Sequence, residues 1–272
     1  MIRSNYHTHT TFCDGLNTVD ECAEAAVALG LHALGFSGHA YMPLDGVYCG
    51  MTPAAMLEYD KCVHEVKERY HGRINIYYGL ENDAAYMHPC DSYDYTIGSV
   101  HCIKCGDRYY GVDSREDIVE HLVKDKFDGD GLAFAEAYYD TMLEFVSHKR
   151  ADILGHIDLV RRFNSPGARF FDETDPRYRR AAKAALECAV HSGYLIEVST
   201  APLSRGFSDN LYPSDFLLEY ARELNARVIV SSDAHSAANL IFAFDRAEAA
   251  LHGVGFTERW ELTADGFIAV RI

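Results

Sequence analysis

Short apolar runs alternate with longer amphipathic stretches along the chain, and the two patterns predict different elements. The short runs are rich in Ile, Val and Tyr and are bounded by Gly or polar residues, which is typical of buried strands. They predict seven strands, over residues 2–9, 33–39, 74–81, 95–101, 152–156, 194–198 and 227–233.

The amphipathic stretches predict six helices between and after these strands. Residues 18–29 open with Thr18-x-x-Glu21, which is a capping box. Residues 53–70 follow the cap residue Thr52 and place Pro53 at the first helical position. The other helices are predicted over 132–148, 176–191, 213–225 and 237–251, and residues 256–272 predict a short strand pair around Asp265-Gly266.

The alternation of strand and helix implies parallel strands joined by crossovers. Seven such strands favour a closed or nearly closed βα barrel, with a doubly wound open sheet as the main alternative. No G-x-G-x-x-G follows the first predicted strand, and no G-x-x-x-x-G-K-[ST] occurs, so the nucleotide-cradling motifs of open sheets are absent. We therefore expect a single barrel domain over residues 1–272.

Composition and charge narrow the class of partner. Apolar residues make up 48% of the chain and charged residues 24%, which is an ordinary globular profile. The net charge of −16 would repel a phosphate backbone, so we expect no nucleic-acid partner, whereas a small anionic substrate can bind in a locally positive pocket. No stretch approaches the roughly 20 apolar residues of a membrane span, and no signal-peptide pattern follows Met1. We expect a cytoplasmic protein without a membrane partner.

The eight cysteines, at positions 13, 22, 49, 62, 90, 102, 105 and 188, do not form the pattern of a disulfide scaffold. Cys102 and Cys105 make a C-x-x-C, but one such pair without a second is a weak zinc signal. We interpret them as two free thiols near a strand end.

Histidine and acidic residues gather at the C-terminal ends of the predicted strands. His7 and His9 end the first strand, and their spacing puts both rings on one face. Later strands end in His39, Glu81, His101, His156 and Asp233, with His235 two residues further on. Active sites of βα barrels lie at this end, so we expect these side chains to converge. The other histidines, on predicted helices or loops, are expected to be structural: His32, His64, His71, His88, His121, His148, His191 and His252.

A set of imidazoles and carboxylates suits Zn, Mn or Fe and leaves positions open for water and substrate. A tetrahedral site uses three or four protein ligands, so this larger set indicates two or three divalent ions, with Glu81 as a candidate bridge. Clustered ions can clamp the attacking and leaving oxygens of phosphoryl transfer and generate hydroxide near neutral pH.

The motif series resembles that of the PHP (polymerase and histidinol phosphatase) superfamily, and within it the histidinol-phosphate phosphatases of histidine biosynthesis. The resemblance runs from residue 5 to about 240 and rests on His7-Thr8-His9-Thr10, Asp14, Ser37-Gly38-His39, Gly79-Leu80-Glu81, Ser99-Val100-His101, Gly155-His156-Ile157-Asp158 and Ser232-Asp233-Ala234-His235. It implies a distorted (β/α)7 TIM-like barrel with a trinuclear metal site at the C-terminal ends of the strands. The implied reaction is hydrolysis of L-histidinol phosphate to L-histidinol and phosphate.

The resemblance also implies three ligand sets. One metal would be held by His7, His9, Glu81 and Asp233, a second by Glu81, His101 and His156, and a third by Asp14, His39 and His235. Many superfamily members carry His at the position of Asp14, and the Asp here resembles the histidinol-phosphatase form.

Three arginines follow the strand-end motifs and are candidates for phosphate binding: Arg161, Arg162 and Arg205. Arginine suits bidentate contact with phosphate, and the family carries a basic residue after Gly-His-x-Asp and an Arg after Glu-x-Asn. The stretch Leu211-Tyr212-Pro213 also matches the family. Asp233 or His235 is a candidate for relaying a proton to the leaving alkoxide.

Two departures from the family pattern fall on the substrate side. The family usually has Glu-x-Asn-Thr/Ser where this chain has Glu197-Val198-Ser199-Thr200, and Ser199, a candidate substrate contact, reaches less far than Asn. Ser204-Arg205-Gly206 stands where Gly-Leu-Arg is common. A phosphoesterase acting on a nucleotide or another small phosphate therefore stays open as an alternative.

Two more distant alternatives are disfavoured. An amidohydrolase-type barrel commonly bridges its metals with a carbamylated Lys, but the matching position here is Glu81, and Lys104 is displaced from any strand end. A non-catalytic metal-binding module would more often have lost ligands, and no polymerase domain accompanies this one.

Overall fold

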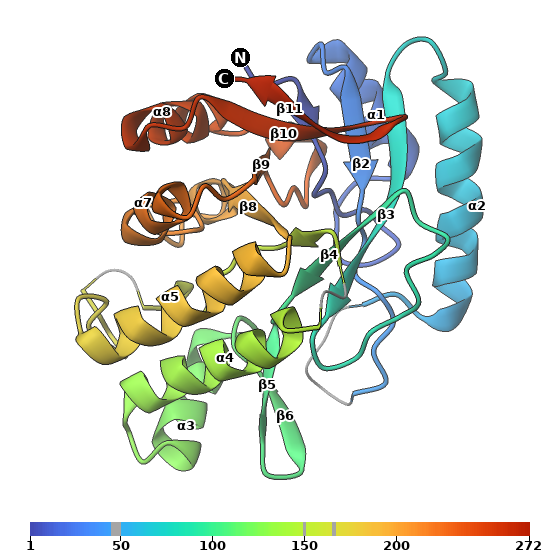
Figure 1. Ribbon diagram of the computed structural model, residues 1–272. Coiled ribbons are helices and arrows are strands. Elements are labelled where there is room, and N and C mark those ends of the chain that lie inside the picture. Colours follow the sequence, from blue (N-terminus) through green and yellow to red (C-terminus); the bar gives the residue numbers. More distant parts are fainter. Residues whose placement is uncertain (45–49, 149–150, 165–166) are drawn as a thin grey trace.

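Seven parallel strands form one sheet in the computed structural model, which describes residues 1–44, 50–148, 151–164 and 167–272 (Figure 1). Their order across the sheet is β1 (Ser4–Asn5), β2 (Ala33–Phe36), β3 (Asn75–Asp83), β4 (Tyr95–Ser99), β7 (Ile153–Leu154), β8 (Leu195–Ser199) and β9 (Val228–Ser231). Beyond β1 and β9, His9 N–H donates to Ala234 O at 2.8 Å and Ala234 N–H donates to His7 O at 3.0 Å. These bonds bring the two edges together, which confirms the predicted α/β barrel over the open sheet.

Most of these strands are shorter than predicted. The first prediction extends to His9, whereas β1 pairs with β2 only at Ser4 and Asn5. The chain then leaves the ladder, because the backbone of residues 7–9 bonds to Ala234 and to Ser37 instead. Glu81 lies inside β3, which continues to Asp83. The histidines thus follow the strands at the predicted edge without being part of them.

Helices cover the outside of the sheet in Figure 1. Those that match the predictions are α1 (Val19–Ala28), α2 (Pro53–Arg69), α4 (Gly131–Val146), α5 (Pro176–His191) and α7 (Asp215–Glu223). The capping box is confirmed, since Thr18 Oγ1 accepts the Glu21 N–H and the Glu21 carboxylate accepts the Thr18 N–H.

The single helix predicted over 237–251 is wrong. The chain forms a 3-10 turn, η2 (Ala237–Asn239), and then a separate helix, α8 (Phe244–Val254). Ala243 before α8 has φ 54°, a left-handed conformation that interrupts a continuous helix. The apolar spacing of Leu240, Phe244 and Ala247, all of them buried, continues across this break and hides it.

The elements that the hydrophobic pattern does not predict all follow the C-terminal ends of β4, β7 and β8. They are the hairpin of β5 (Cys102–Cys105) and β6 (Arg108–Gly111), the helix α3 (Glu116–Lys126), the 3-10 turn η1 (Leu159–Arg161) and the short helix α6 (Ala201–Ser204). They build walls at one end of the barrel.

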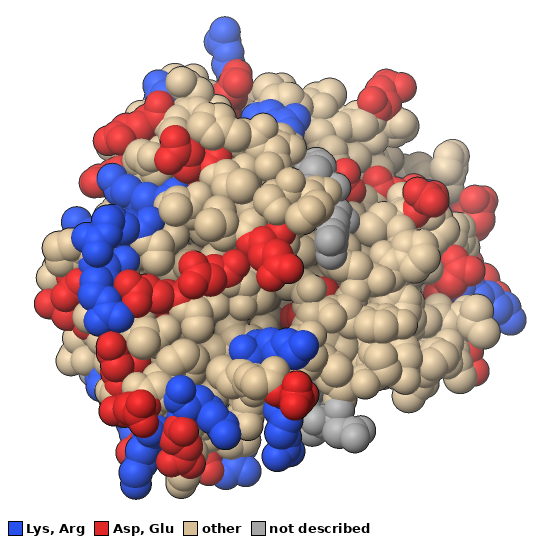
Figure 2. Space-filling model, turned by 60° about the horizontal axis from the view of Figure 1, so that its bottom comes forward, with Lys and Arg blue, Asp and Glu red and all other residues tan. Residues whose placement is uncertain are grey.

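The predicted C-terminal strand pair is confirmed as β10 (Glu258–Thr263) and β11 (Gly266–Arg271). Tyr6 O–H donates to Leu262 O at 3.1 Å, and Ser4 Oγ donates to Glu261 Oε1 at 2.8 Å. The hairpin therefore covers the N-terminal ends of the strands. The opposite end is hollowed, and acidic and basic side chains both border the hollow (Figure 2).

The remaining expectations concern cysteines and membranes. Seven cysteines, including Cys102 and Cys105, are free thiols, and Cys49 lies outside the described residues.

Within the described ranges, no helix combines the length and the apolar character needed to cross a membrane.

Candidate metal centre

The nine predicted ligands lie together at the C-terminal end of the barrel. They fall into four overlapping groups, and within each group the ligand atoms are all within 4.8 Å of one another. The groups are His9, Asp14, His39 and His235; His7, His9 and Asp233; His7, Glu81 and His156; and His39, Glu81 and His101. The members come from segments after β1, β2, β4, β7 and β9 and from β3 itself, so the parallel sheet assembles the cluster.

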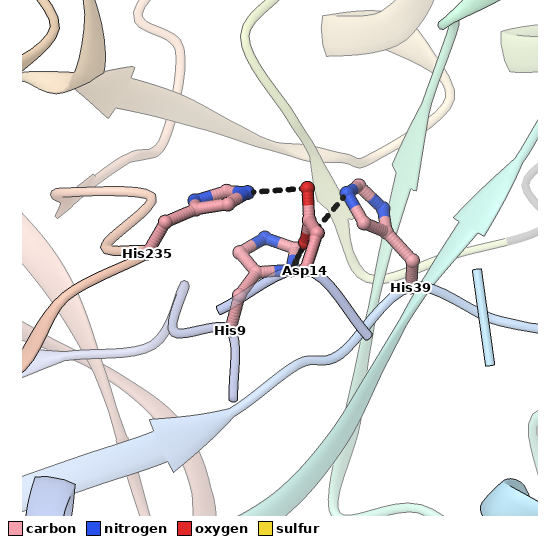
Figure 3. A group of neighbouring side chains, drawn as sticks. All are labelled: His9, Asp14, His39 and His235. Atoms are coloured by element: carbon pink, nitrogen blue, oxygen red, sulfur yellow. Dashed lines mark hydrogen bonds and ion pairs between the residues drawn. The ribbon is translucent and has the colours of Figure 1, made fainter. Parts of the chain in front are cut away.

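Asp14 joins three histidines at the outer side of the cluster (Figure 3). Its Oδ2 lies 3.1 Å from His235 Nε2, and its Oδ1 lies 3.7 Å from both His9 Nδ1 and His39 Nε2. The loop that carries it folds tightly back on His9, because a Cβ on Gly15 would lie 2.5 Å from the His9 carbonyl carbon. The glycine after Asp14 is thus a requirement of this turn.

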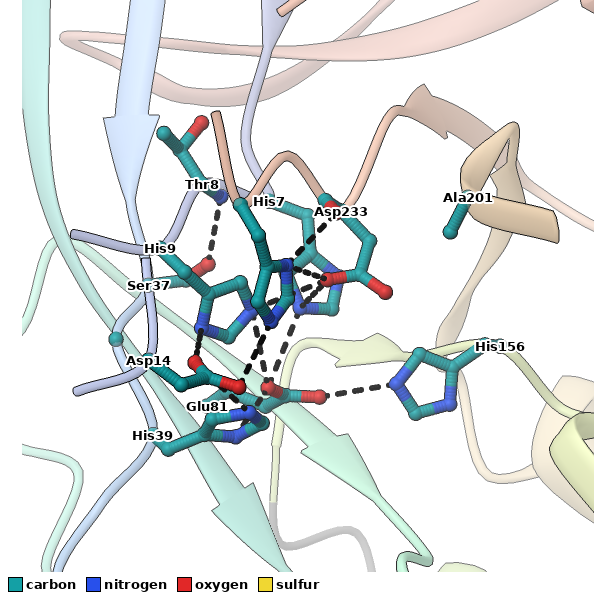
Figure 4. Close-up of polar contacts among 12 residues, drawn as sticks. His7, Thr8, His9, Asp14, Ser37, His39, Glu81, His156, Ala201 and Asp233 are labelled. Carbon is teal, nitrogen blue, oxygen red and sulfur yellow. Dashed lines mark hydrogen bonds and ion pairs between the residues drawn. The ribbon is translucent and has the colours of Figure 1, made fainter. Parts of the chain in front are cut away.

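Glu81 occupies the centre of the cluster and is fully buried (Figure 4). Its Oε1 lies 3.1 Å from His156 Nε2 and 3.4 Å from His101 Nε2. Its Oε2 lies 2.8 Å from His39 Nδ1 and 3.3 Å from His7 Nε2. With His9 Nε2 at 3.5 Å from Oε2, the carboxylate contacts five histidines and has the position of a bridging ligand.

Three buried ligand atoms at the centre of the cluster make ion-pair contacts, such as Glu81 Oε2 to His39 Nδ1 at 2.8 Å, but no hydrogen bond. His7 Nε2, His9 Nε2 and Glu81 Oε2 have no hydrogen-bond partner among the described residues. An unsatisfied buried polar atom costs about 1–3 kcal/mol, and three that face one another call for a common partner. Neutral imidazole and carboxylate are ligands for divalent Zn, Mn and Fe. The residues present therefore fit a divalent metal.

Burial and neighbouring charges set the protonation of these ligands. Burial lowers the pKa of His9 well below its usual value, and two neighbouring histidines lower it further. Burial opposes ionisation of Glu81, but three histidines lower its pKa well below the usual carboxyl range. The pKa of Asp233 is also lowered, because the Arg205 charge and nearby histidines outweigh burial. These groups are in their metal-binding forms at neutral pH.

His7 and His101 have the opposite tendency. Burial disfavours their charged forms, but the surrounding carboxylates raise both pKa values well above the usual histidine value. A metal must replace these protons, so binding should release protons to solution.

Two further buried carboxylates orient the ligands. Glu197 Oε1 lies 2.6 Å from His7 Nδ1, and Asp83 Oδ2 lies 3.1 Å from His101 Nδ1. Such contacts fix the ring tautomer and leave Nε2 for the metal. The sequence motifs predict no such role for either residue. Asp83 follows Glu81 by two positions on β3, and this period-2 spacing is the signal that could have found it.

A cavity of about 410 Å³ adjoins the cluster. Its metal-side wall includes Asp14, His39, His101, His156, Asp233 and His235. The other wall comes from the segments after β6, β7 and β8 and contains Asp113, Ser114, Arg115, Ile118, Leu159, Arg162 and Arg205. Small-molecule sites commonly have this concave form with a few convergent polar groups.

Two of the predicted phosphate-binding arginines line this cavity. Arg205 Nη2 lies 3.6 Å from Asp233 Oδ1 and also contacts the ring of His235. The guanidinium of Arg162 lies 4.2 Å from the centre of the Phe207 ring, and its Nη1 lies 3.2 Å from Asp113 Oδ2. Both arginines therefore line the same cavity as the predicted metal ligands.

The structure does not bring Arg161 or Ser199 to the cavity. Arg161 is 5% exposed and pairs with Asp158 Oδ2 at 3.1 Å and Glu173 Oε2 at 2.7 Å. Ser199 is fully buried, and its Oγ accepts the Ala201 N–H at 3.3 Å. For either residue to contact the substrate as predicted, its side chain would have to leave these buried contacts and turn toward the cavity.

Lys104 and the C-x-x-C pair also lie outside the cluster. Lys104 is exposed on β5, with its Nζ 5.8 Å from the centre of the Tyr109 ring. Burial raises the pKa of the Cys102 thiol and, to a smaller degree, that of Cys105. Neither feature contributes a ligand to the groups described above.

The chain is similar in sequence to one known domain family and to two relatives named as histidinol-phosphatases. The model of the PHP domain matches residues 5–201. The chain is 25% identical to histidinol-phosphatase of Bacillus subtilis (strain 168), over 90% of this chain and 98% of that protein. It is 22% identical to "Probable histidinol-phosphatase" of Schizosaccharomyces pombe, over 92% and 86%.

One solved structure covers almost the whole chain. It is histidinol phosphate phosphatase from Lactococcus lactis subsp. lactis, complexed with Zn, L-histidinol and phosphate. The alignment spans 98% of each chain at 19% identity, with a TM-score of 0.70. The two chains therefore share a fold.

Proposed function

The chain belongs to the PHP domain family, and we propose that it is a metal-dependent phosphate monoester hydrolase that converts L-histidinol phosphate to L-histidinol and phosphate. The observation that carries this proposal is the buried ligand group of His7, His9 and Glu81, whose atoms lack a hydrogen bond and whose neighbours His39, His156 and Asp233 line a cavity that contains two arginines. The relatives named as histidinol-phosphatases and the L. lactis complex support the choice of substrate.

We propose that three ions occupy the centre. The ligand sets are His7, His9, Glu81 and Asp233; Glu81, His101 and His156; and Asp14, His39 and His235. Two of the observed groups combine residues from different sets. One contains both His9 and Asp14, and another contains both His39 and Glu81, so the three sets lie in one compact centre. Zinc is favoured by the L. lactis neighbour, and Mn and Fe accept the same ligands. When bound, the ions supply Lewis-acid stabilisation and a nucleophile at neutral pH.

The chain's own residues position the substrate. Arg162 and Arg205 would bind the phosphoryl oxygens, because guanidinium groups pair with phosphate in a bidentate manner and stabilise the charge of the transition state. Asp233 Oδ1 lies 3.4 Å from His235 Nδ1, and both residues line the cavity. This pair would hold and transfer the proton that the leaving alkoxide requires.

We also propose that residues 1–272 act as one domain. The C-terminal hairpin is joined to the start of the chain through Tyr6 and Leu262 at the closed end of the barrel. Loss of this hairpin would expose the N-terminal ends of the strands.

The test is phosphate release from L-histidinol phosphate by protein reconstituted with Zn, Mn or Fe(II), beside AMP and other sugar and amino-alcohol phosphates. We expect metal-dependent turnover with histidinol phosphate preferred, and its loss in His101→Ala. His121→Ala is the matched control, since His121 is exposed on α3. No turnover of any phosphate, despite stoichiometric metal, would contradict the proposal.

A second candidate is a PHP phosphoesterase that acts on a nucleotide or another small phosphate. The specific observation in its favour is Ser199-Thr200 where the family pattern has Asn followed by Thr or Ser. Turnover of AMP or other phosphates without histidinol phosphate would select this candidate and keep the metal chemistry.

A further inference from the structure

One carboxylate in the cavity wall is placed there by the β5–β6 hairpin. Cys102 pairs with Gly111 across the hairpin, and Val112 N–H then donates to His101 O at 2.8 Å. The next residue, Asp113, therefore lies beside His101 and lines the cavity. Its side chain is 22% exposed, so it is accessible from the cavity.

The carboxylates that line the cavity differ in their partners. Asp14 and Asp233 belong to the close ligand groups, whereas Asp113 belongs to none of those found among the described residues. Its Oδ2 pairs with Arg162 Nη1 at 3.2 Å, and its Oδ1 has no hydrogen-bond donor within the described ranges. One oxygen of Asp113 is thus available to a ligand.

A negative charge at this position works against a phosphate ligand. Juxtaposed like charges are unfavourable, and an acidic group next to a phosphate-binding arginine weakens the field that attracts the phosphate. A substrate that carries its own positive charge near the phosphate reverses this effect. In a phosphate ester such as L-histidinol phosphate, the ammonium group is bonded to the carbon next to the phosphoester carbon. The phosphate and the ammonium are therefore close enough to lie in one cavity.

We propose that Asp113 accepts the ammonium group of the substrate and thereby selects phosphate monoesters of amino alcohols over those of neutral alcohols and sugars. This assignment rests on the proposed phosphatase function and names the substrate class of the same cavity. Ile118 and Leu159 add apolar area to the wall for the rest of the alcohol. Nucleoside monophosphates have no ammonium group and are disfavoured.

The test uses two esters that differ only in the amine: L-histidinol phosphate and 3-(imidazol-4-yl)propyl phosphate. The value of kcat/KM is measured for both with the metal-loaded protein at about pH 7.5, where an imidazole with a pKa of about 6.5 is mostly neutral. We expect Asp113→Asn to lower the ratio of the two values about tenfold or more. Asp113→Glu keeps the charge and should retain part of the preference.

Asp107→Asn is the matched control, because it removes the same charge from the exposed turn of the same hairpin. It should keep the wild-type ratio. An equal loss on both esters in Asp113→Asn would overturn the proposal and make Asp113 a positioning residue for Arg162. An unchanged ratio would overturn it as well.

Failure of the proposed function is distinguishable from failure of this inference. A wild type that hydrolyses neither ester contradicts the phosphatase proposal. The affinity of L-histidinol for the metal-loaded wild type and for Asp113→Asn, measured by calorimetry, then decides the inference, and equal affinities would overturn it. Melting curves and metal content show whether the variant is folded and loaded.

Discussion

Glu197 Oε1 lies 2.6 Å from His7 Nδ1, and both side chains are buried in the barrel. The other carboxylate oxygen of Glu197 accepts the backbone N–H of His156 at 2.6 Å. One carboxylate thus orients two ligands of the candidate metal centre. It makes Nδ1 of His7 the donor, so that Nε2 faces Glu81.

The first prediction concerns this contact. Glu197→Gln keeps the shape but removes the charge that fixes the His7 tautomer, and we expect metal affinity or activity to fall about 10- to 100-fold. Competition with a chelator measures the affinity, and kcat at saturating metal separates positioning from occupancy. Glu223→Gln, at an exposed position of α7, is the control. A Glu197→Gln protein with wild-type affinity and kcat would show that the contact does not tune the centre.

The second prediction concerns removal of the metal. The buried atoms of His7, His9 and Glu81 that lack a hydrogen bond within the described residues should make the metal-free protein less stable. A ligand that binds only the native state adds about 2.7 kcal/mol of stability at 100 times its Kd. We expect Tm to fall on chelation and to recover on addition of Zn or Mn. Glu81→Gln should lose most of this metal-dependent shift, and a Tm that is independent of metal in the wild type would count against the centre.

Much of the candidate site follows from the sequence, because parallel strands convert a position along the chain into a position in space. His39, His101 and His156 follow three different strands, and the shared edge of the sheet brings them to Glu81. This inference does not require accurate strand ends. It holds although β1 ends at Asn5, well before the predicted His9.

The rest of the cavity depends on segments without such periodicity. Asp113 reaches it through the β5–β6 hairpin, which turns at Gly106 with φ 63°, and it follows β6 of this hairpin rather than a strand of the main sheet. The choice between Arg161 and Arg162 depends on the 3-10 turn η1, where adjacent side chains point in different directions. Neither strand nor helix periodicity fixes such positions, so the sequence leaves them open.

The third prediction concerns the closed end of the barrel. Glu261 is buried, and it accepts from Ser4 Oγ at 2.8 Å and from Arg259 Nη1 at 2.6 Å. Burial opposes its ionisation, but Arg259 and Ser4 lower the pKa of the Glu261 carboxyl. A lowered folded-state pKa gives stability that is present above the unfolded value of about 4.3 and is lost as the pH falls through the folded value.

Glu261→Gln should therefore cost about 1.5–3 kcal/mol at neutral pH, the contribution of hydrogen bonds to a charged group. The difference from wild type should shrink as the pH falls below about 4. Urea unfolding at both pH values measures it, with Glu258→Gln, exposed on the same strand, as the control. A difference that does not change with pH would mean that the charge of Glu261 is not what stabilises the hairpin.

The fourth prediction separates two arginines that the sequence places in equivalent roles. Arg205 lines the cavity beside Asp233, so Arg205→Ala should lower kcat/KM about 10²- to 10³-fold, as expected for loss of a group that stabilises transition-state charge. Arg161 is buried between Asp158 and Glu173, and Arg161→Ala should cost about 3–5 kcal/mol of stability by leaving a buried charge unpaired. Urea unfolding and steady-state kinetics on both variants test the separation. An Arg161→Ala protein of normal stability whose kcat/KM falls as far as that of Arg205→Ala would restore Arg161 as a substrate contact.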